Sequence, residues 1–308
     1  MKHRTQSCFF KTHFRRGFVL GIFVRLLFCD AISFQKLSAA TLHLAPNVDT
    51  ALRSNLPDTA FGSAGALPVG VAVLGNPTNR ALLKFPIELV PTNAVIIRVT
   101  LQIASTSSNP NTMQTADFSL HRLLKDWNET DTTWNNRLAG VSWTIPGGQP
   151  DEDFVATSSA TTPISPATVS GPSIALFTSE QLISDVELWR ENSATNFGWL
   201  LTAVNDAAAS GKQIASREDN INTPILMIEY TVPAAPIILS DPKISDATFQ
   251  FSFQATAGQA YEVQACGDIS TEPWEIIRTI PPVERDTIVI ITNAISGSQR
   301  FFRVVVSE

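Results

Sequence analysis

The sequence predicts an all-β fold, a jelly-roll-like β-sandwich followed by a small immunoglobulin- or fibronectin-like β-sandwich. The composition is rich in Thr, Ser, Asn, Val and Ile, Pro (19) outnumbers Gly (15), and only 16% of the residues are charged. That composition favours short strands and ordered turns. Apolar residues also alternate with polar ones in many short runs that end at Pro or Gly. The pattern changes after a proline-containing linker at residues 232–236, and 308 residues allow about two domains.

Residues 1–40 predict a signal peptide. Their start is basic, residues 17–29 are apolar except for Arg25, and Ser38, Ala39 and Ala40 are small enough for a cleavage site. The alternative is a membrane anchor, but the apolar run is shorter than the roughly 20 residues that span a bilayer. We therefore expect an exported protein, extracellular or at the cell surface, with no membrane span in the mature chain.

Charge and cysteines limit the classes of partner. Removal of residues 1–40 takes away seven of the 22 Lys and Arg and one of the 28 Asp and Glu, which leaves 15 basic and 27 acidic residues and a formal charge of −12. So acidic a surface argues against nucleic acid as a partner. Cys8 and Cys29 lie in the predicted signal, so Cys266 is left without an internal disulfide partner, and we expect it to be a small core residue.

The first domain, residues 41–232, opens with strands. Residues 41–60 predict an edge strand and a loop, and residues 69–74 a short strand between glycines. In the strand at 79–86, a period of two places Arg80, Leu82 and Lys84 on one face and Ala81, Leu83 and Phe85 on the other. Residues 94–104 form the clearest strand, and residues 118–123 form another.

A stretch with two tryptophans follows at residues 126–136. Trp127 and Trp134 stand seven residues apart in an otherwise polar run, a period that suits no strand. One interpretation is an ordered loop whose indole rings plug the edge of the sandwich. The other is that a ring of Trp127, Trp134 or Trp143 stays exposed and stacks on a sugar.

Later segments complete the pattern. Residues 157–172 are rich in Ser, Thr and Pro and predict an exposed loop, and residues 179–191 predict a helix capped by Ser179. Residues 198–204 and 224–230 predict apolar strands. In the second domain, residues 233–308, about five short alternating strands indicate an immunoglobulin-like sandwich.

Several motifs of the first domain occur in the order typical of one family. They are residues 79–85 (NRALLKF), 127–129 (WNE), 133–135 (TWN), 146–148 (PGG), 183–189 (ISDVELW), 196–201 (NFGWLL) and 224–230 (PILMIEY). Residues 41–232 therefore resemble the DNRLRE domain, which is related to family 96 carbohydrate-binding modules. Residues 261–304 resemble the small β-sandwich at the ends of large secreted bacterial proteins. The resemblance implies a jelly-roll outside the cytoplasm and, for characterised members, binding of acidic polysaccharide such as alginate. The acidic charge of this chain argues against a uronate ligand.

Basic and aromatic side chains are the candidate ligand-binding residues. If they gather on one sheet face, Arg80, Lys84, Arg122 and Arg217 could hold carboxylates of a polysaccharide, with Trp127 and Trp134 beside them. The alternative is ordinary strand-face charge that discourages edge pairing.

Acidic turns are the candidate metal sites. Asp151 and Asp153 supply hard oxygen ligands in a Gly- and Pro-containing turn, which makes calcium the candidate cofactor. The alternative is a solvated acidic turn, and we expect no other cofactor.

Motifs of catalysis are missing from the sequence: it contains no H-E-x-x-H, G-x-S-x-G or C-x-x-C, and the chain after residue 40 has only His43 and His121. We predict a non-catalytic module that binds polysaccharide or a cell-surface component. A structural spacer without a ligand and a polysaccharide-cleaving enzyme with paired carboxylates stay open as alternatives.

Overall fold

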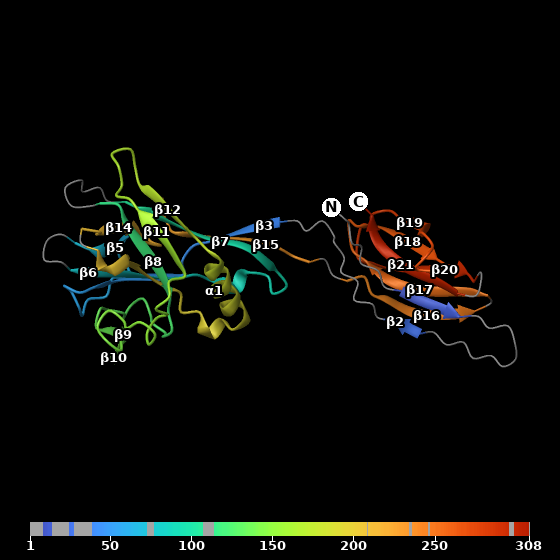
Figure 1. Cartoon of the computed structure of the whole chain (residues 1–308), viewed down its shortest axis with the longest axis horizontal. Helices are drawn as coiled ribbons and strands as arrows, with labels where there is room; N and C mark the ends of the chain where they lie inside the picture. The colour runs from blue at the N-terminus through green and yellow to red at the C-terminus, as the bar shows by residue number, and fades with distance from the viewer. Residues whose placement is uncertain are drawn as a thin grey trace. The chain divides into compact units, whose positions relative to one another are not determined.

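The structure, a computed structural model, describes residues 9–13, 25–27, 39–72, 77–106, 114–207, 209–233, 236–245, 247–295 and 299–307. The contacts divide the chain into two compact units (Figure 1). The larger domain comprises Ser38–Val232, and the smaller domain comprises Met1–Leu37 together with Pro233–Glu308.

Antiparallel strands build the larger domain. Within its described residues the strand order is β11-β8-β13-β6-β5-β14-β7-β15-β3, with β12 paired to β7 and β4 to β6, and β9 and β10 form a separate ribbon. The strands are β3 (Ala39–Leu44), β4 (Val48–Arg53), β5 (Ala66–Val71), β6 (Thr78–Lys84), β7 (Val95–Ser105), β8 (Ala116–Arg122), β9 (Asn136–Leu138), β10 (Val141–Ser142), β11 (Ala160–Ile164), β12 (Ser173–Thr178), β13 (Trp199–Ala203), β14 (Lys212–Ala215) and β15 (Ile225–Thr231).

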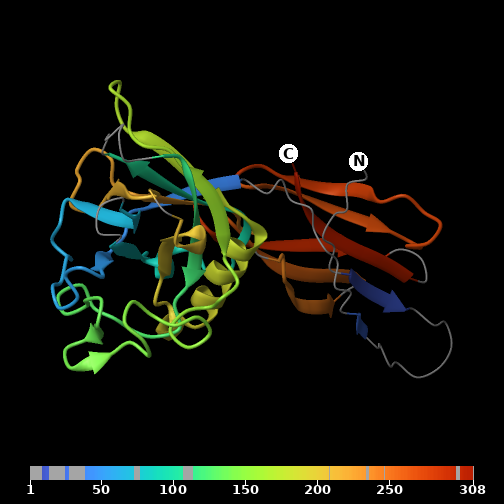
Figure 2. The same cartoon turned by 60° about the vertical axis from the view of Figure 1, so that its left-hand side comes forward.

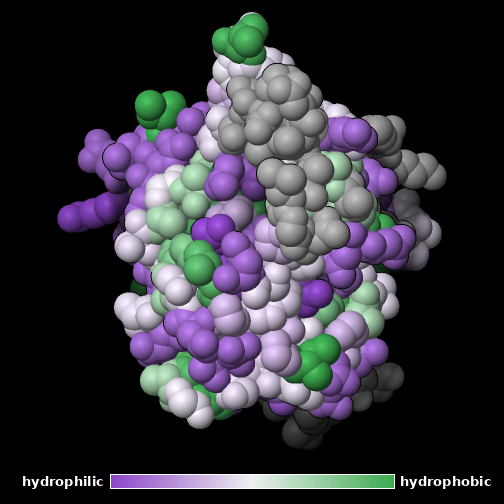
Figure 3. Space-filling model, turned by 90° about the vertical axis from the view of Figure 1, so that its left-hand side faces the viewer, coloured by the Kyte–Doolittle hydropathy of each residue, from purple (hydrophilic) through white to green (hydrophobic). Residues whose placement is uncertain are grey.

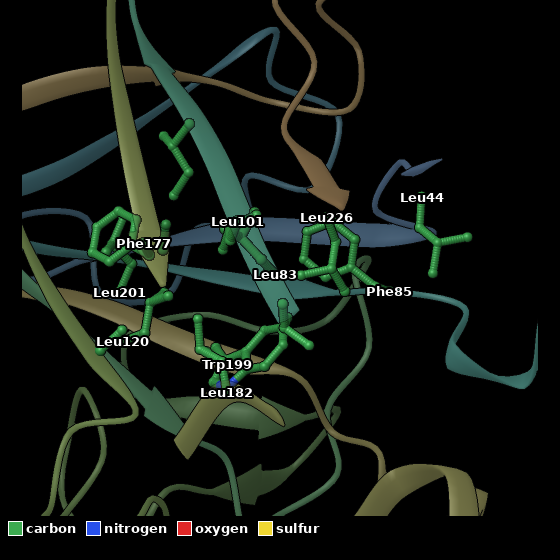
Figure 4. Close-up of a cluster of buried hydrophobic side chains, with 14 of the residues drawn as sticks. Leu44, Leu83, Phe85, Leu101, Leu120, Phe177, Leu182, Trp199, Leu201 and Leu226 are labelled. Carbon is green, nitrogen blue, oxygen red and sulfur yellow. The ribbon is translucent and has the colours of Figure 1, made fainter. Parts of the chain in front are cut away.

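The main core lies between the two halves of this strand path. Leu83 and Leu201 from β6 and β13 share one buried cluster with Leu101 and Leu226 from β7 and β15 (Figure 4). Each of these side chains is withdrawn from water, and burial of a Leu side chain contributes about 1.5–3 kcal/mol. The prediction of an all-β sandwich is confirmed.

A second, smaller cluster covers the opposite face of β6 and β13. It contains Leu52, Leu82, Leu123, Trp143, Phe154 and Leu200, with Trp127, Trp134 and Phe197 packed against it. Because side chains alternate along a strand, Leu82 falls in this cluster while Ala81 and Leu83 fall in the main core. The two rings of the tryptophan-containing loop therefore pack on the sandwich, as the first interpretation predicts, but on the outer face of β6 and β13 and not at an edge.

One α-helix of the described chain, α1 (Glu180–Glu191), packs at one end of the strands (Figure 2). Ser179 caps it, since its hydroxyl accepts a hydrogen bond from the N–H of Leu182 at 3.0 Å. Leu182, Val186 and Trp189 are buried on one face, which confirms the predicted helix. The short 3₁₀ turns are η1 (Ile87–Leu89), η2 (Ser193–Thr195) and η3 (Val204–Asp206).

The exposed loop predicted at residues 157–172 is wrong in part, because Ala160–Ile164 form strand β11 on β8. Ala160 and Ile164 are buried, so the segment completes an edge of the sheet despite its Ser, Thr and Pro content. The strand predicted at residues 69–74 begins earlier, at Ala66. Pro68 is tolerated there, because β6 pairs with β5 only from Gly70 onward and Pro68 faces no partner on that side.

The described residues of the smaller domain form two sheets, ordered β19-β18-β21-β1-β2 and β16-β17-β20. Phe249, Phe251 and Phe253 supply much of its core, and Cys266 is buried, as predicted. The export signal stays a prediction: β1 and β2 fall within it, and β1 pairs with β21. The strands are β1 (Phe9–His13), β2 (Arg25–Leu27), β16 (Leu239–Ser245), β17 (Thr248–Ala255), β18 (Ala260–Cys266), β19 (Glu275–Ile280), β20 (Thr287–Ala294) and β21 (Gln299–Ser307).

Candidate functional site

A pocket with a volume of about 290 Å³ opens on the outer face of β6, β8 and β13. The lining includes Arg80, Ser119, His121, Phe154, Thr202 and Asp206. The volume is near the lower end of the roughly 300–1,000 Å³ typical of small-molecule sites. The pocket is therefore large enough for a small ligand, such as one residue of a sugar chain.

Strand register aligns the polar floor of the pocket. Thr202 on β13 stands directly opposite Ser119 on β8, and Leu200 stands opposite His121. Because side chains alternate, Phe118, Leu120 and Leu201 turn into the main core while these polar neighbours turn outward. Ser119 is also hydrogen-bonded to Thr161 across the next strand pair, with 2.7 Å between the two hydroxyl oxygens.

Arg80 forms one wall of the pocket and is fixed by its surroundings. Its Nη1 donates to the carbonyl oxygens of Gly147 and Gly148 at 2.6 and 3.2 Å. The guanidinium carbon lies 5.6 Å from the ring centroid of Trp134 and 5.9 Å from that of Phe154. Both distances are within the range of cation–π attraction. Burial lowers the pKa of Arg80 from its usual value, and the negative charge of Asp206 opposes that shift.

A glycine makes this anchor possible. Gly147 has a φ of +85°, and a Cβ at this position would lie 2.6 Å from the ring of Trp134. Only glycine combines that backbone conformation with so close an approach. The sequence Pro-Gly-Gly at residues 146–148 thus holds both Trp134 and Arg80 in place.

Two residues that line the pocket each have one buried polar atom without a partner. Among the described residues, neither Arg80 Nε nor Thr202 Oγ1 has a hydrogen-bond partner, and both atoms are buried. A buried polar group without a partner costs about 1–3 kcal/mol of folding free energy. Other buried atoms of the described residues, such as Thr50 Oγ1, are also without a partner, so this feature alone does not mark a binding site.

His121 adds a neutral hydrogen-bonding group. Its Nδ1 lies 3.0 Å from the carbonyl oxygen of Val155, and its ring meets Phe154 edge to face at 5.3 Å. Burial lowers the pKa of His121 below its usual value of 6.5, and the positive charge of Arg80 lowers it further. The ring is therefore neutral at neutral pH, and when Nδ1 donates to Val155, Nε2 remains an acceptor.

The rim carries an exposed carboxylate on an unusual backbone. Asn205 and Asp206 have φ values of +54° and +46°, the left-handed region that few residues other than glycine occupy. Both side chains are exposed. Of the described residues that line the pocket, Asp206 alone has a carboxylate. A glycosidase-type pair of carboxylates is thus not found among them.

The predicted ligand-binding residues are only partly brought together. Arg80 lines the pocket and stacks near Trp134, whereas Lys84 is half-buried at the end of β6 and outside the lining. Trp127 donates from Nε1 to the carbonyl oxygen of Phe197 at 2.8 Å, which fixes the loop to the sandwich.

Arg122 and Arg217 are committed to ion pairs elsewhere. Arg122 Nε lies 3.2 Å from Asp185, a buried carboxylate that also accepts hydrogen bonds from Ser159 and Trp199. Arg217 binds both carboxylate oxygens of Glu129 at 2.7 and 2.8 Å. The basic residues therefore do not form one patch.

Asp151 and Asp153 have separate structural partners. Asp153 is buried and accepts hydrogen bonds from the N–H and hydroxyl of Thr144 and from the N–H of Gln149. Asp151 accepts one from the N–H of Ala156 at 3.0 Å. Across the described ranges, no three His, Cys, Asp or Glu side chains are grouped as a metal site. Calcium binding stays a prediction.

Ser119, His121, Phe154, Thr202 and Asp206 line the pocket but are not among the binding residues predicted from the sequence. Period-two alternation in residues 118–121 and 199–203 places Ser119, His121 and Thr202 outward. It does not show that β8 and β13 are neighbours, so their common pocket was not predictable from spacing alone.

Comparison with known proteins supports a binding function for this domain. Residues 40–144 match the sequence model of carbohydrate-binding module family 96. Arg80, Ser119 and His121 lie inside the matched span, while Phe154, Thr202 and Asp206 follow it. No curated protein matches the chain. No helix among the described residues is long and apolar enough to cross a membrane. Residues 40–144 of the larger domain are thus similar to the carbohydrate-binding modules of family 96.

Proposed function

We propose that the protein is an exported, non-catalytic module that binds polysaccharide in the pocket on the outer face of β6, β8 and β13. The observation that carries this proposal is a pocket of about 290 Å³ whose lining combines Arg80, Ser119, His121 and Thr202 with the ring of Phe154. The family match supplies the ligand class.

The lining suits a sugar chemically. Ser119 and His121 offer neutral hydrogen-bonding groups, Thr202 offers a hydroxyl once its side chain rotates toward the pocket, and Arg80 offers charged donors. The apolar body of Phe154 forms one wall, against which the C–H groups of a sugar ring can pack. The exported location is supported by the basic and apolar character of residues 1–40.

The test uses Thr202→Val in the full chain. Valine keeps the shape of threonine but removes the unpartnered hydroxyl, so we expect the unfolding free energy to rise or stay unchanged. If the hydroxyl serves the ligand, the same substitution weakens binding about fivefold to tenfold, the equivalent of roughly 1 kcal/mol. Binding is measured by affinity electrophoresis and calorimetry against alginate, pectin and neutral glucans.

Thr50→Val is the matched control. Thr50 is buried on β4, its Oγ1 is likewise unpartnered among the described residues, and it does not line the pocket. We expect it to match Thr202→Val in stability and wild type in affinity. Equal affinities for wild type and Thr202→Val, or no binding to any of these polysaccharides, would contradict the proposed site.

A further inference from the structure

The charges around the pocket bear on which sugars it can hold. Its cation, Arg80, has Nη1 engaged by the carbonyls of Gly147 and Gly148, and Asp206 lies close enough to influence it electrostatically. His121 is neutral at neutral pH, because burial lowers its pKa. One positive and one negative side chain therefore offset each other in the lining. The whole chain adds an acidic background, with a formal charge of −6.

Asp206 is the more accessible of the two charges. Its side chain is exposed at the rim, whereas Arg80 Nε is buried. Among the described residues, no side-chain carboxylate–cation contact within 4 Å is found for Asp206. A carboxylate has acceptors only, and it can accept from two adjacent sugar hydroxyls at once. The carboxylate of a uronate residue would meet this like charge at the entrance.

The backbone fixes this carboxylate at the entrance. Two consecutive non-glycine residues, Asn205 and Asp206, adopt left-handed conformations one residue beyond the end of β13, the strand that carries Thr202. Residues in such sparsely populated conformations cluster at ligand-binding sites, where the surrounding structure holds them. Asn and Asp tolerate this conformation better than most residues.

We infer that the pocket selects a neutral sugar residue with adjacent hydroxyl groups over a uronate, and that Asp206 is its specificity-determining residue. The hydroxyls donate to the Asp206 carboxylate at the rim, while Thr202 and Ser119 bind polar atoms of the sugar at the floor. This inference rests on the proposed carbohydrate binding. It departs from the acidic polysaccharide that the family resemblance implies.

The experiment compares affinities of the full chain for neutral and acidic polymers. Calorimetry at two salt concentrations uses β-glucan, mannan and xylan as neutral probes, and alginate and polygalacturonate as acidic probes. We expect wild type to bind one of the neutral probes more tightly than either uronate. Asp206→Asn keeps the shape and the left-handed tolerance of the residue, and it should weaken that binding at least about tenfold, as expected for loss of a hydrogen bond to a charged group.

Glu88→Gln is the matched control, because Glu88 is exposed on η1 and does not line the pocket. Its affinities should equal those of wild type. If wild type binds a uronate polymer more tightly than the neutral probes, and Asp206→Asn strengthens that binding further, the inference is overturned. The proposed polysaccharide binding would still stand. Unchanged affinity of Asp206→Asn for the neutral probe would also overturn it. Binding to none of the five probes would contradict the proposed function itself.

Discussion

Asp49 shows how one buried carboxylate ties the tryptophan-containing loop to the sheet. It is fully buried on β4, and its Oδ2 accepts a hydrogen bond from the N–H of Arg217 at 2.7 Å. Its own N–H donates to Glu129 Oε1 at 3.0 Å, and Arg217 binds the same carboxylate of Glu129. Burial raises the pKa of Asp49 from 3.8 to about 7, and the negative charges of Glu218 and Glu129 add to that shift, while the N–H and charge of Arg217 oppose it.

This shift predicts a pH-dependent effect of Asp49→Asn. The folded state binds the proton more tightly than the unfolded state, so the contribution of Asp49 to stability is full below about pH 4 and is lost as the pH rises through about 7. Asn stays neutral at every pH. We expect Asp49→Asn to raise the unfolding free energy by about 1–3 kcal/mol at pH 8.5 and by much less at pH 5.

Urea denaturation at both pH values measures this difference, with Glu152→Gln as a control for removal of an exposed acid. A stabilisation of equal size at pH 5 and pH 8.5 would show that Asp49 is not the titrating group. Destabilisation at both would show that its negative charge is needed by Arg217.

At the scale of elements, the close packing of β13 against β6 depends on Gly198. Its φ is +78°, and a Cβ there would lie 2.1 Å from the carbonyl oxygen of Leu83. The pairing of Trp199 with Leu83 starts directly after it. A side chain at residue 198 would therefore push apart the two strands that carry Thr202 and Arg80.

Gly198→Ala and Gly140→Ala separate this clash from backbone strain. Gly140 has a similar φ of +70°, but nothing lies within 4 Å of a Cβ placed there. Gly140→Ala should lower the unfolding free energy by about 1–2 kcal/mol, because alanine is strained in a left-handed conformation. Gly198→Ala should lower the unfolding free energy by at least about 2 kcal/mol more than Gly140→Ala, because the backbone of β6 must move. Equal losses, measured by thermal and urea denaturation, would mean that the two strands separate at little cost.

The elements themselves were largely predictable from the sequence. Residues 94–104 alternate apolar and polar side chains and form β7, and Ser179 with its helical spacing predicts α1. The two segments that were predicted incorrectly, at β5 and β11, have local causes. Pro68 is tolerated in β5, since one side of that residue has no partner strand, and β11 is an edge strand in which Ser, Thr and Pro are acceptable.

At the scale of the whole larger domain, the site was much less predictable than the fold. The pocket joins residues from β6, β8 and β13 with the loop around Phe154 and the turn at Asp206. These segments are up to 126 positions apart, from Arg80 to Asp206. Sequence spacing fixes which face of a strand a side chain occupies, but not which strands become neighbours. Arg80 was identified for its charge, although much of its role is to anchor Gly147 and Gly148.

Amide hydrogen exchange of the full chain, with and without the polysaccharide that it binds most tightly, tests whether carbohydrate binds in the pocket. Ligand in the pocket should slow exchange in peptides that cover residues 119–122, 150–158 and 202–206, because these segments surround it. Peptides of β7, β12 and the smaller domain should exchange at unchanged rates. If exchange slows only in β7, β12 or the smaller domain, and not around Thr202, the carbohydrate binds elsewhere. That result would contradict binding in the pocket.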